Sequence, residues 1–217
     1  MDSIIDFFIK KKIEEMEKYK VREKNELHVR ELIECPEKLV LKDRYPFLVV
    51  PTNPAFMMGD LIHIGLQEII KEWGKENSVS VEVEKEIEKK FVVDGEEYIV
   101  KGRPDIVLPD MVIEIKSAKA DISIPQIHHE LQLKVYMNFL KKKGILIYIT
   151  PERCAEYDYE DGLSDQDIAG MIRDTVTGRR KPYYWECSRC PFSGFCSKKI
   201  VGGDRNVRFG GDVEEDR

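Results

Sequence analysis

The chain lacks long apolar runs and is poor in amide side chains. In its 217 residues no stretch approaches the roughly 18 apolar residues of a membrane span. Residues 1–12 have no leading basic segment, and their amphipathic pattern indicates a helix and not a signal peptide. We therefore expect a soluble, cytoplasmic protein with no membrane attachment. Only five Asn and four Gln beside 35% charged residues favour a thermophilic source.

The chain also lacks an excess of positive charge. Its 35 Lys and Arg against 41 Asp and Glu give a net charge of −6, which is unusual for a nucleic-acid-binding protein. An acidic protein can still approach phosphates where a bound metal supplies positive charge. Short basic clusters are better explained as solvated faces than as a DNA track; they are 10–12, 141–143, 179–181 and 198–199. No Gly-x4-Gly-Lys-Ser/Thr loop is present, which excludes a nucleotide-driven motor.

Hydrophobic periodicity and turn residues predict a mixed sheet flanked by helices. The expected helices cover 3–20, 27–34, 54–73 (capped by Asn53), 126–143 and 165–177 (capped by Ser164). The expected strands cover 79–90, a hairpin of 91–93 and 98–101, a second hairpin of 105–108 and 111–116, and 145–150. This order indicates an α/β (α+β) fold. The Gly-rich tail 202–217 is expected to be mobile.

Two carboxylates and a lysine gather in the second predicted hairpin. A loop centred on Pro109-Asp110 pairs Asp105 with Glu114, so the Cβ atoms of the two acids lie roughly 5 Å apart. Lys116 projects from the same face as Glu114, because side chains alternate along a strand. The alternative is a surface strand with a salt bridge, but the apolar flanks favour burial. We therefore expect a site for a divalent cation.

Two helical segments carry further polar side chains. Gly59-Asp-Leu-Ile-His63 places an imidazole one turn after a glycine, and Gln132-Leu-Lys-Val-Tyr136 places an amide and a phenol on one helix face. Each alone is weak, since a lone helical His or a Gln/Tyr pair is usually an ordinary surface or core feature.

Four of the five cysteines could supply the ligands of a metal centre. Cys187, Cys190 and Cys196 are close in sequence, and Cys35 stands far from them; together they satisfy an iron–sulfur cluster or a structural Zn²⁺. Disulfides are disfavoured by the odd number and the expected compartment. Zinc sites usually offer a second close cysteine pair, which is absent. Cys154 is interpreted as a structural thiol.

The order Gly-x-x-x-His, Gly-x-Pro-Asp, Glu-x-Lys and Gln-x-x-x-Tyr resembles the RecB-like branch of the PD-(D/E)XK nuclease superfamily. With the cysteines and the small size, the chain resembles the CRISPR-associated exonuclease family, the Cas protein numbered four. The resemblance implies a restriction-endonuclease-like mixed central sheet in one domain, 1–201. An iron–sulfur cluster, 4Fe-4S favoured over 2Fe-2S, would join parts 1–50 and 180–201.

The resemblance also implies roles for single residues. His63, Asp105, Glu114 and the Ile115 carbonyl would hold Mn²⁺ or Mg²⁺, Lys116 would act on the attacking water, and Gln132 and Tyr136 would position DNA. The expected activity is exonucleolytic cleavage of single-stranded DNA ends in CRISPR spacer acquisition (prespacer processing). The expected partner is the spacer integrase complex, and the oligomeric state stays open. The alternatives are a non-catalytic DNA-end-binding subunit and a viral or repair RecB-like nuclease.

Overall fold

The computed structural model describes residues 3–18, 23, 25–45, 48, 54–183 and 185–200. Helix α1 (Ile4–Lys18) precedes strand β1 (Glu26–His28), the 3₁₀ helix η1 (Val29–Leu32), α2 (Pro36–Arg44) and α3 (Pro54–Glu76). Five strands follow: β2 (Glu82–Val83), β3 (Ile87–Val93), β4 (Glu96–Gly102), β5 (Ile106–Val107) and β6 (Met111–Ser117). The rest comprises α4 (Ile127–Leu140), β7 (Lys143–Ile149), β8 (Cys154–Tyr159), α5 (Asp165–Val176) and α6 (Glu186–Arg189).

The larger sheet has five strands in the order β2-β5-β6-β7-β8 and mixes parallel with antiparallel pairs. The predicted register of the β5–β6 hairpin is confirmed, because Ile106 pairs with Ile113 across a two-residue loop. Strand β6 then pairs in parallel with β7 through the α4 crossover. Strand β8, which the sequence did not predict, completes the sheet.

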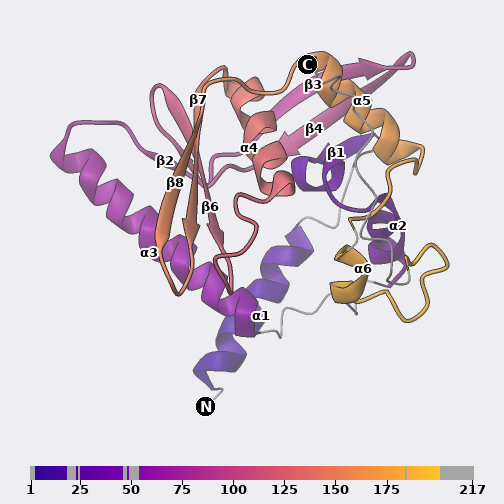
Figure 1. Ribbon diagram of the computed structural model, residues 1–217, viewed down its shortest axis with the longest axis horizontal. Helices are drawn as coiled ribbons and strands as arrows, with labels where there is room; N and C mark the ends of the chain where they lie inside the picture. The colour runs from indigo at the N-terminus through magenta and orange to yellow at the C-terminus, as the bar shows by residue number, and fades with distance from the viewer. Residues whose placement is uncertain are drawn as a thin grey trace, which may run out of the picture.

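Helices cover both faces of this sheet (Figure 1), and β6 divides its side chains between them. Ile113 and Ile115 point toward α3, where they form a cluster with Ile62 and Leu66. Val112 faces the other way and packs with Leu133 and other residues of the main core. Because side chains alternate along a strand, Glu114 and Lys116 lie on the α4 side with Val112.

A second sheet of three strands, β1-β4-β3, shows that the sequence prediction of one sheet was incomplete. The predicted helix over 27–34 is wrong in its first part, because Glu26–His28 pair in parallel with Ile99–Lys101. Only a 3₁₀ turn, Val29–Leu32, follows. Pro36 begins α2, because the amide hydrogen that proline lacks would have no acceptor within the helix at this position. The β3–β4 hairpin about Asp94-Gly95 is confirmed.

Two further boundaries differ from the sequence prediction. Helix α3 continues past Gly74 to Glu76. A Cβ on Gly74 would lie 2.3 Å from Val81 Cγ2, so glycine serves a close approach there and not helix termination. The predicted strand 79–90 is broken at Glu84, which has a positive φ of 52° and separates β2 from β3 in different sheets. The helix cap at Asn53 and the tail 202–217 lie outside the described residues.

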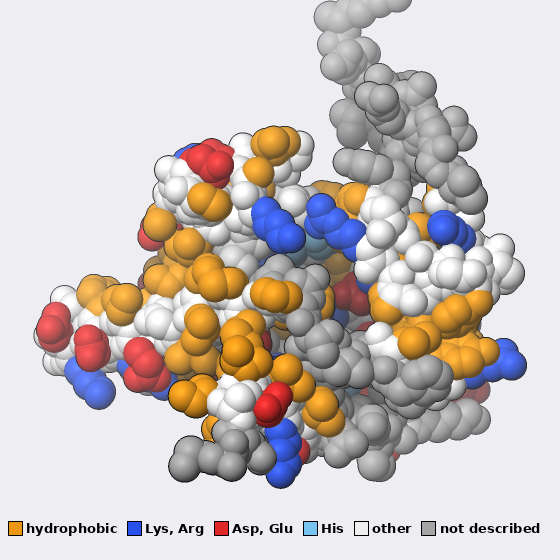
Figure 2. Space-filling view, turned by 90° about the horizontal axis from the view of Figure 1, so that it is seen from below, with side chains coloured by type: hydrophobic (Ala, Val, Ile, Leu, Met, Phe, Trp, Pro, Cys, Tyr) orange, Lys and Arg blue, Asp and Glu red, His pale blue; other side chains and the backbone are white. Residues whose placement is uncertain are grey.

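Helices α1 and α3 carry an exposed apolar surface, which Figure 2 shows from below as a broad group of hydrophobic side chains. Its large members include Ile4, Ile5 and Phe7 on α1 and Phe56, Met58, Leu61, Ile64 and Ile69 on α3, each more than half exposed. An ion pair between Lys12 and Asp60, 3.3 Å apart, joins the two helices. Within the described ranges, no helix is long and apolar enough to cross a bilayer.

Candidate active site and cysteine pocket

Asp105, the residue before β5, is held in place by backbone and side-chain contacts. It is 6% exposed. Its Oδ2 accepts a hydrogen bond of 2.6 Å from the Ile115 backbone N–H, and its Oδ1 lies 3.1 Å from His63 Nδ1. A carboxylate partner favours the tautomer in which Nδ1 carries the proton, which leaves the lone pair on Nε2. The hairpin and α3 together thus bring His63, Asp105 and Ile115 to one place.

Glu114 is buried with only one of its two carboxylate oxygens hydrogen-bonded. It is 2% exposed, its Oε1 accepts a 2.5 Å hydrogen bond from Lys116 Nζ, and its Oε2 is buried without a hydrogen-bond partner. Burial and the nearby charge of Asp105 raise the pKa of Glu114 to about 7, although Lys116 opposes this shift. A buried carboxylate oxygen without a donor is costly. The site therefore has an acceptor that a cation would satisfy.

A chain of hydrogen bonds leads from Glu114 to α4. Lys116 Nζ also donates to Gln132 Oε1 at 3.0 Å, and Gln132 Nε2 donates to Tyr136 Oη at 3.3 Å. Burial raises the pKa of the Tyr136 phenol, so it is neutral and can donate a hydrogen bond. The structure thus brings the predicted site residues of the nuclease core into two hydrogen-bonded groups, which adjoin where Ile115 follows Glu114.

The two motif glycines fit the packing around this group. A Cβ on Gly102 would lie 2.5 Å from Tyr136 Cε1, so only glycine lets the phenol ring approach β4. A Cβ on Gly59 would lie 3.3 Å from Ser117 Oγ, where α3 approaches the end of β6. Each glycine therefore marks a close contact that helps to set the positions of the site residues.

His63 gains a proton more readily than an isolated imidazole. Burial lowers its pKa, but the hydrogen bond and charge of Asp105 outweigh burial and raise the pKa overall. Binding a cation through the imidazole requires the neutral ring, so protons and cations compete for this residue.

Glu84 is a residue that sequence reasoning missed. Its backbone N–H donates to the Asp105 carbonyl at 3.1 Å. Its side chain accepts from Gln67 Nε2 at 3.0 Å and pairs with Arg103 at 2.7 Å. Gln67 lies one turn after His63 on α3, so Glu84 connects the two elements that supply His63 and Asp105. The sequence carries no signal of this role, since the alternation of Val and Glu predicts an unbroken strand and the positive φ of Glu84 is seen only in the structure.

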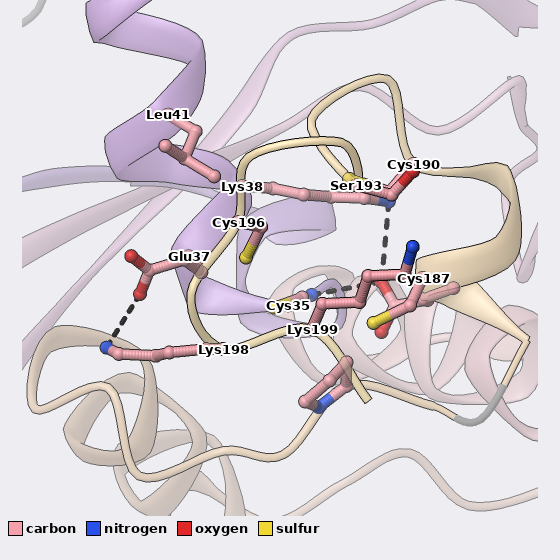
Figure 3. Close-up of a pocket in the computed structure, with 12 residues that line it drawn as sticks. Cys35, Glu37, Lys38, Leu41, Cys187, Cys190, Ser193, Cys196, Lys198 and Lys199 are labelled. Atoms are coloured by element: carbon pink, nitrogen blue, oxygen red, sulfur yellow. Dashed lines mark hydrogen bonds and ion pairs between the residues drawn. The ribbon is translucent and has the colours of Figure 1, made fainter. Parts of the chain in front are cut away.

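The second group of interest is a pocket that all four predicted cysteines line, together with Lys38 and Glu186 (Figure 3). Cys35 immediately precedes α2, Cys187 lies in α6, and Cys190 and Cys196 follow it. All four are free thiols of intermediate exposure, whereas Cys154 is free and exposed. Burial raises the pKa values of Cys35 and Cys190.

Neither group is a preformed cage. Among the residues that the structure describes, no three or more His, Cys, Asp or Glu side chains are arranged so that they could hold a metal ion. The donor chemistry nevertheless fits in both places. Glu114 offers a buried oxygen with no partner, next to Asp105, and the pocket gathers four thiols from the two distant ends of the described chain.

Comparison with known proteins agrees with this geometry. No family model matches the chain. The crystal structure of SSO0001 superposes with a TM-score of 0.85 at 35% identity and covers 92% of this chain and 99% of that one. The fold is therefore the RecB-like, mixed α+β fold of PD-(D/E)XK nucleases. The CRISPR-associated exonuclease Cas4 of Saccharolobus solfataricus strain P2 is 35% identical over 207 residues, 91% of this chain and 100% of that protein. The chain belongs to the Cas4 family of CRISPR-associated exonucleases.

Proposed function

We propose that this nuclease is a Mg²⁺- or Mn²⁺-dependent DNA exonuclease that acts on single-stranded ends. The observation that carries the proposal is the buried pair of Asp105 and Glu114, in which Glu114 Oε2 has no hydrogen-bond donor. A divalent cation held by these carboxylates supplies the positive charge that a phosphodiester and an attacking water require. His63, whose Nδ1 lies 3.1 Å from Asp105 Oδ1, and the Ile115 carbonyl would complete the proposed ligand set.

The remaining residues have roles that follow from their contacts. Lys116 bonds to both Glu114 and Gln132, so it is placed to orient or deprotonate a water beside the carboxylates. Gln132 and Tyr136 present an amide and a neutral phenol, which can bond to phosphate oxygens without adding charge. The chain's own residues thereby orient the water and the nucleic acid on the α4 side of the sheet.

The proposed setting is spacer acquisition, in which the enzyme trims DNA fragments before a spacer integrase inserts them into an array. Membership of a CRISPR-associated exonuclease family supports this role. We further propose that residues 1–201 form one nuclease domain. Deleting the gene in a host with an active array is expected to alter the length or number of new spacers. Spacers that keep their length and number would refute the role in acquisition.

Substitution of Asp105 by Ala tests the activity. On end-labelled single strands with Mn²⁺ we expect a rate loss of more than about a hundredfold, because a direct ligand is removed. Asp110→Ala, an exposed change in the same hairpin, is the matched control and should retain the rate. Asp105→Ala also leaves the Ile115 N–H unpaired, so folding is checked by circular dichroism. A folded Asp105→Ala protein that cleaves at the wild-type rate would disprove the assignment.

We also propose that Cys35, Cys187, Cys190 and Cys196 bind an iron–sulfur cluster, the 4Fe-4S form being favoured. The four thiols share one pocket, and both ends of the described chain contribute to it. Zn²⁺ is the alternative, but zinc sites usually offer a second close cysteine pair, whereas Cys35 stands far in sequence from the other three.

A visible absorption spectrum of anaerobically purified protein tests the cluster. The wild type should be brown, Cys187→Ser should lose most of the colour and iron, and Cys154→Ser, an exposed thiol, should keep both. An iron chelator should lower the melting temperature of the wild type. A colourless wild type containing one Zn²⁺ per chain would establish the alternative.

A further inference from the structure

The pocket contains a buried carboxylate, Glu186, that none of the roles above uses. Glu186 is 2% exposed and immediately precedes Cys187. Its Oε1 accepts a 3.0 Å hydrogen bond from the Cys35 backbone N–H, across 151 positions of sequence. Its Oε2 accepts one of 2.8 Å from the Tyr183 backbone N–H. Lys38 Nζ lies 3.4 Å from Oε1 and compensates the charge.

The two carboxylate oxygens of Glu186 accept hydrogen bonds from different segments of the chain. Cys35 precedes the first turn of α2, so its N–H has no partner within the helix. Tyr183 belongs to the segment that leads into α6. A single side chain therefore connects the start of α2 with the segment that carries the other cysteines.

The Glu186 side of this connection is itself held to the nuclease core. The ring of Trp185, the residue before Glu186, lies 4.7 Å from that of His128 on α4 and stacks on Tyr183 at 5.6 Å and 9°. His128 is one turn before Gln132 on α4. Tyr183 and Trp185 are thereby anchored on the helix that faces the active site, and Cys35 is the cysteine whose place depends on Glu186.

We propose that Glu186 is a positioning residue that holds Cys35 at the cysteine pocket and so permits cluster assembly there; this rests on the cluster proposed above. The role requires a carboxylate of this length. Glutamine keeps the size but has one acceptor oxygen, so one of the two N–H groups would meet an NH₂ donor. Aspartate is shorter by a methylene and cannot span both N–H groups.

Glu186→Gln is the test variant, and Glu37→Gln is the matched control. Glu37 on α2 pairs with Lys198 at 2.6 Å, so it links the same two regions, but through a partly exposed ion pair and not through the Cys35 backbone N–H, which donates to Glu186. Loss of either hydrogen bond releases one of the two segments that Glu186 joins, so the population with Cys35 in place should fall by about tenfold or more. Glu37→Gln should change little.

Two measurements separate the outcomes. Iron per chain and the visible spectrum are compared after anaerobic purification. A short bis-maleimide is then applied to chelator-treated protein, and linkage of Cys35 to Cys187, Cys190 or Cys196 is measured by mass spectrometry. Far-ultraviolet circular dichroism confirms that each variant is folded. We expect Glu186→Gln to lose about tenfold in both iron and linkage, and Glu37→Gln to lose neither.

Other results lead to distinct conclusions. If the wild type contains no iron but only Glu186→Gln loses the Cys35 linkage, the cluster is refuted and the positioning role stands. If Glu186→Gln is folded and retains both the linkage and the spectrum, the positioning role is overturned whatever the wild type binds. A loss of linkage equal to that of Glu37→Gln would overturn it as well.

Discussion

Replacing Glu114 by Gln should stabilise the metal-free protein at alkaline pH and have little effect in acid. The pKa of Glu114 is raised from 4.5 to about 7 in the folded protein by burial and by Asp105. The folded state therefore binds more protons than the unfolded state between these values. Stability falls as the pH rises through this window, because the buried carboxyl must ionise without a partner for Oε2.

The magnitude follows from the size of the shift. Each pKa unit corresponds to about 1.4 kcal/mol, so ionising Glu114 lowers the free energy of unfolding by up to about 3 kcal/mol above pH 7. Below pH 4.5 the effect vanishes, since the group is neutral in both states. Gln keeps an acceptor for Lys116 but adds an amide that needs a partner, so the observed gain should be smaller, about 1–3 kcal/mol.

Thermal unfolding in a chelating buffer at pH 4 and pH 8 measures the difference. For a chain of this size 1 kcal/mol corresponds to about 2–4 °C, so the Gln variant should melt several degrees higher at pH 8 and at an equal temperature at pH 4. Glu96→Gln, an exposed change in the β3–β4 hairpin, should parallel the wild type at both values. Added Mn²⁺ should stabilise the wild type more than the Gln variant. If the wild type and Glu114→Gln lose the same amount of stability between pH 4 and pH 8, ionisation of Glu114 is not the cause of the loss.

Two simpler changes test the packing around the site. Gly102→Ala should lower the free energy of unfolding by about 1–3 kcal/mol and reduce cleavage, because its methyl group would lie 2.5 Å from the Tyr136 ring. A urea titration measures the stability and the single-strand assay measures the cleavage. An unchanged urea midpoint would contradict the close contact. Ser164→Ala should lower the free energy of unfolding by about 1 kcal/mol, since the Ser164 side chain accepts a hydrogen bond from the Asp167 N–H and caps α5. Cleavage should be unaffected. A loss of activity at unchanged stability would show that α5 has a role beyond packing.

Interactions between residues close in sequence were sufficient to predict the elements that depend on them. The hairpin register that pairs Ile106 with Ile113 follows from the turn at Pro109-Asp110 and from alternation of side chains. The cap at Ser164 and the Asp94-Gly95 turn were found for the same reason. The sequence therefore determined that Asp105, Glu114 and Lys116 would share one place, because all three lie within one hairpin.

Long-range pairing decided what the sequence alone could not. Glu26–His28 became a strand because β4 offered a partner, which outweighed the helical pattern of 27–34. At the break, the Glu84 N–H donates to the carbonyl of Asp105, which lies beyond the β3–β4 hairpin, and Gly74 permits the close approach of Val81 to α3. Glu186 has no local feature that marks it, because its partners at Cys35 and Lys38 come from the other end of the described chain. Hydrogen bonds between distant segments exist only in the folded state, so the residues that hold the sites in place were visible only there.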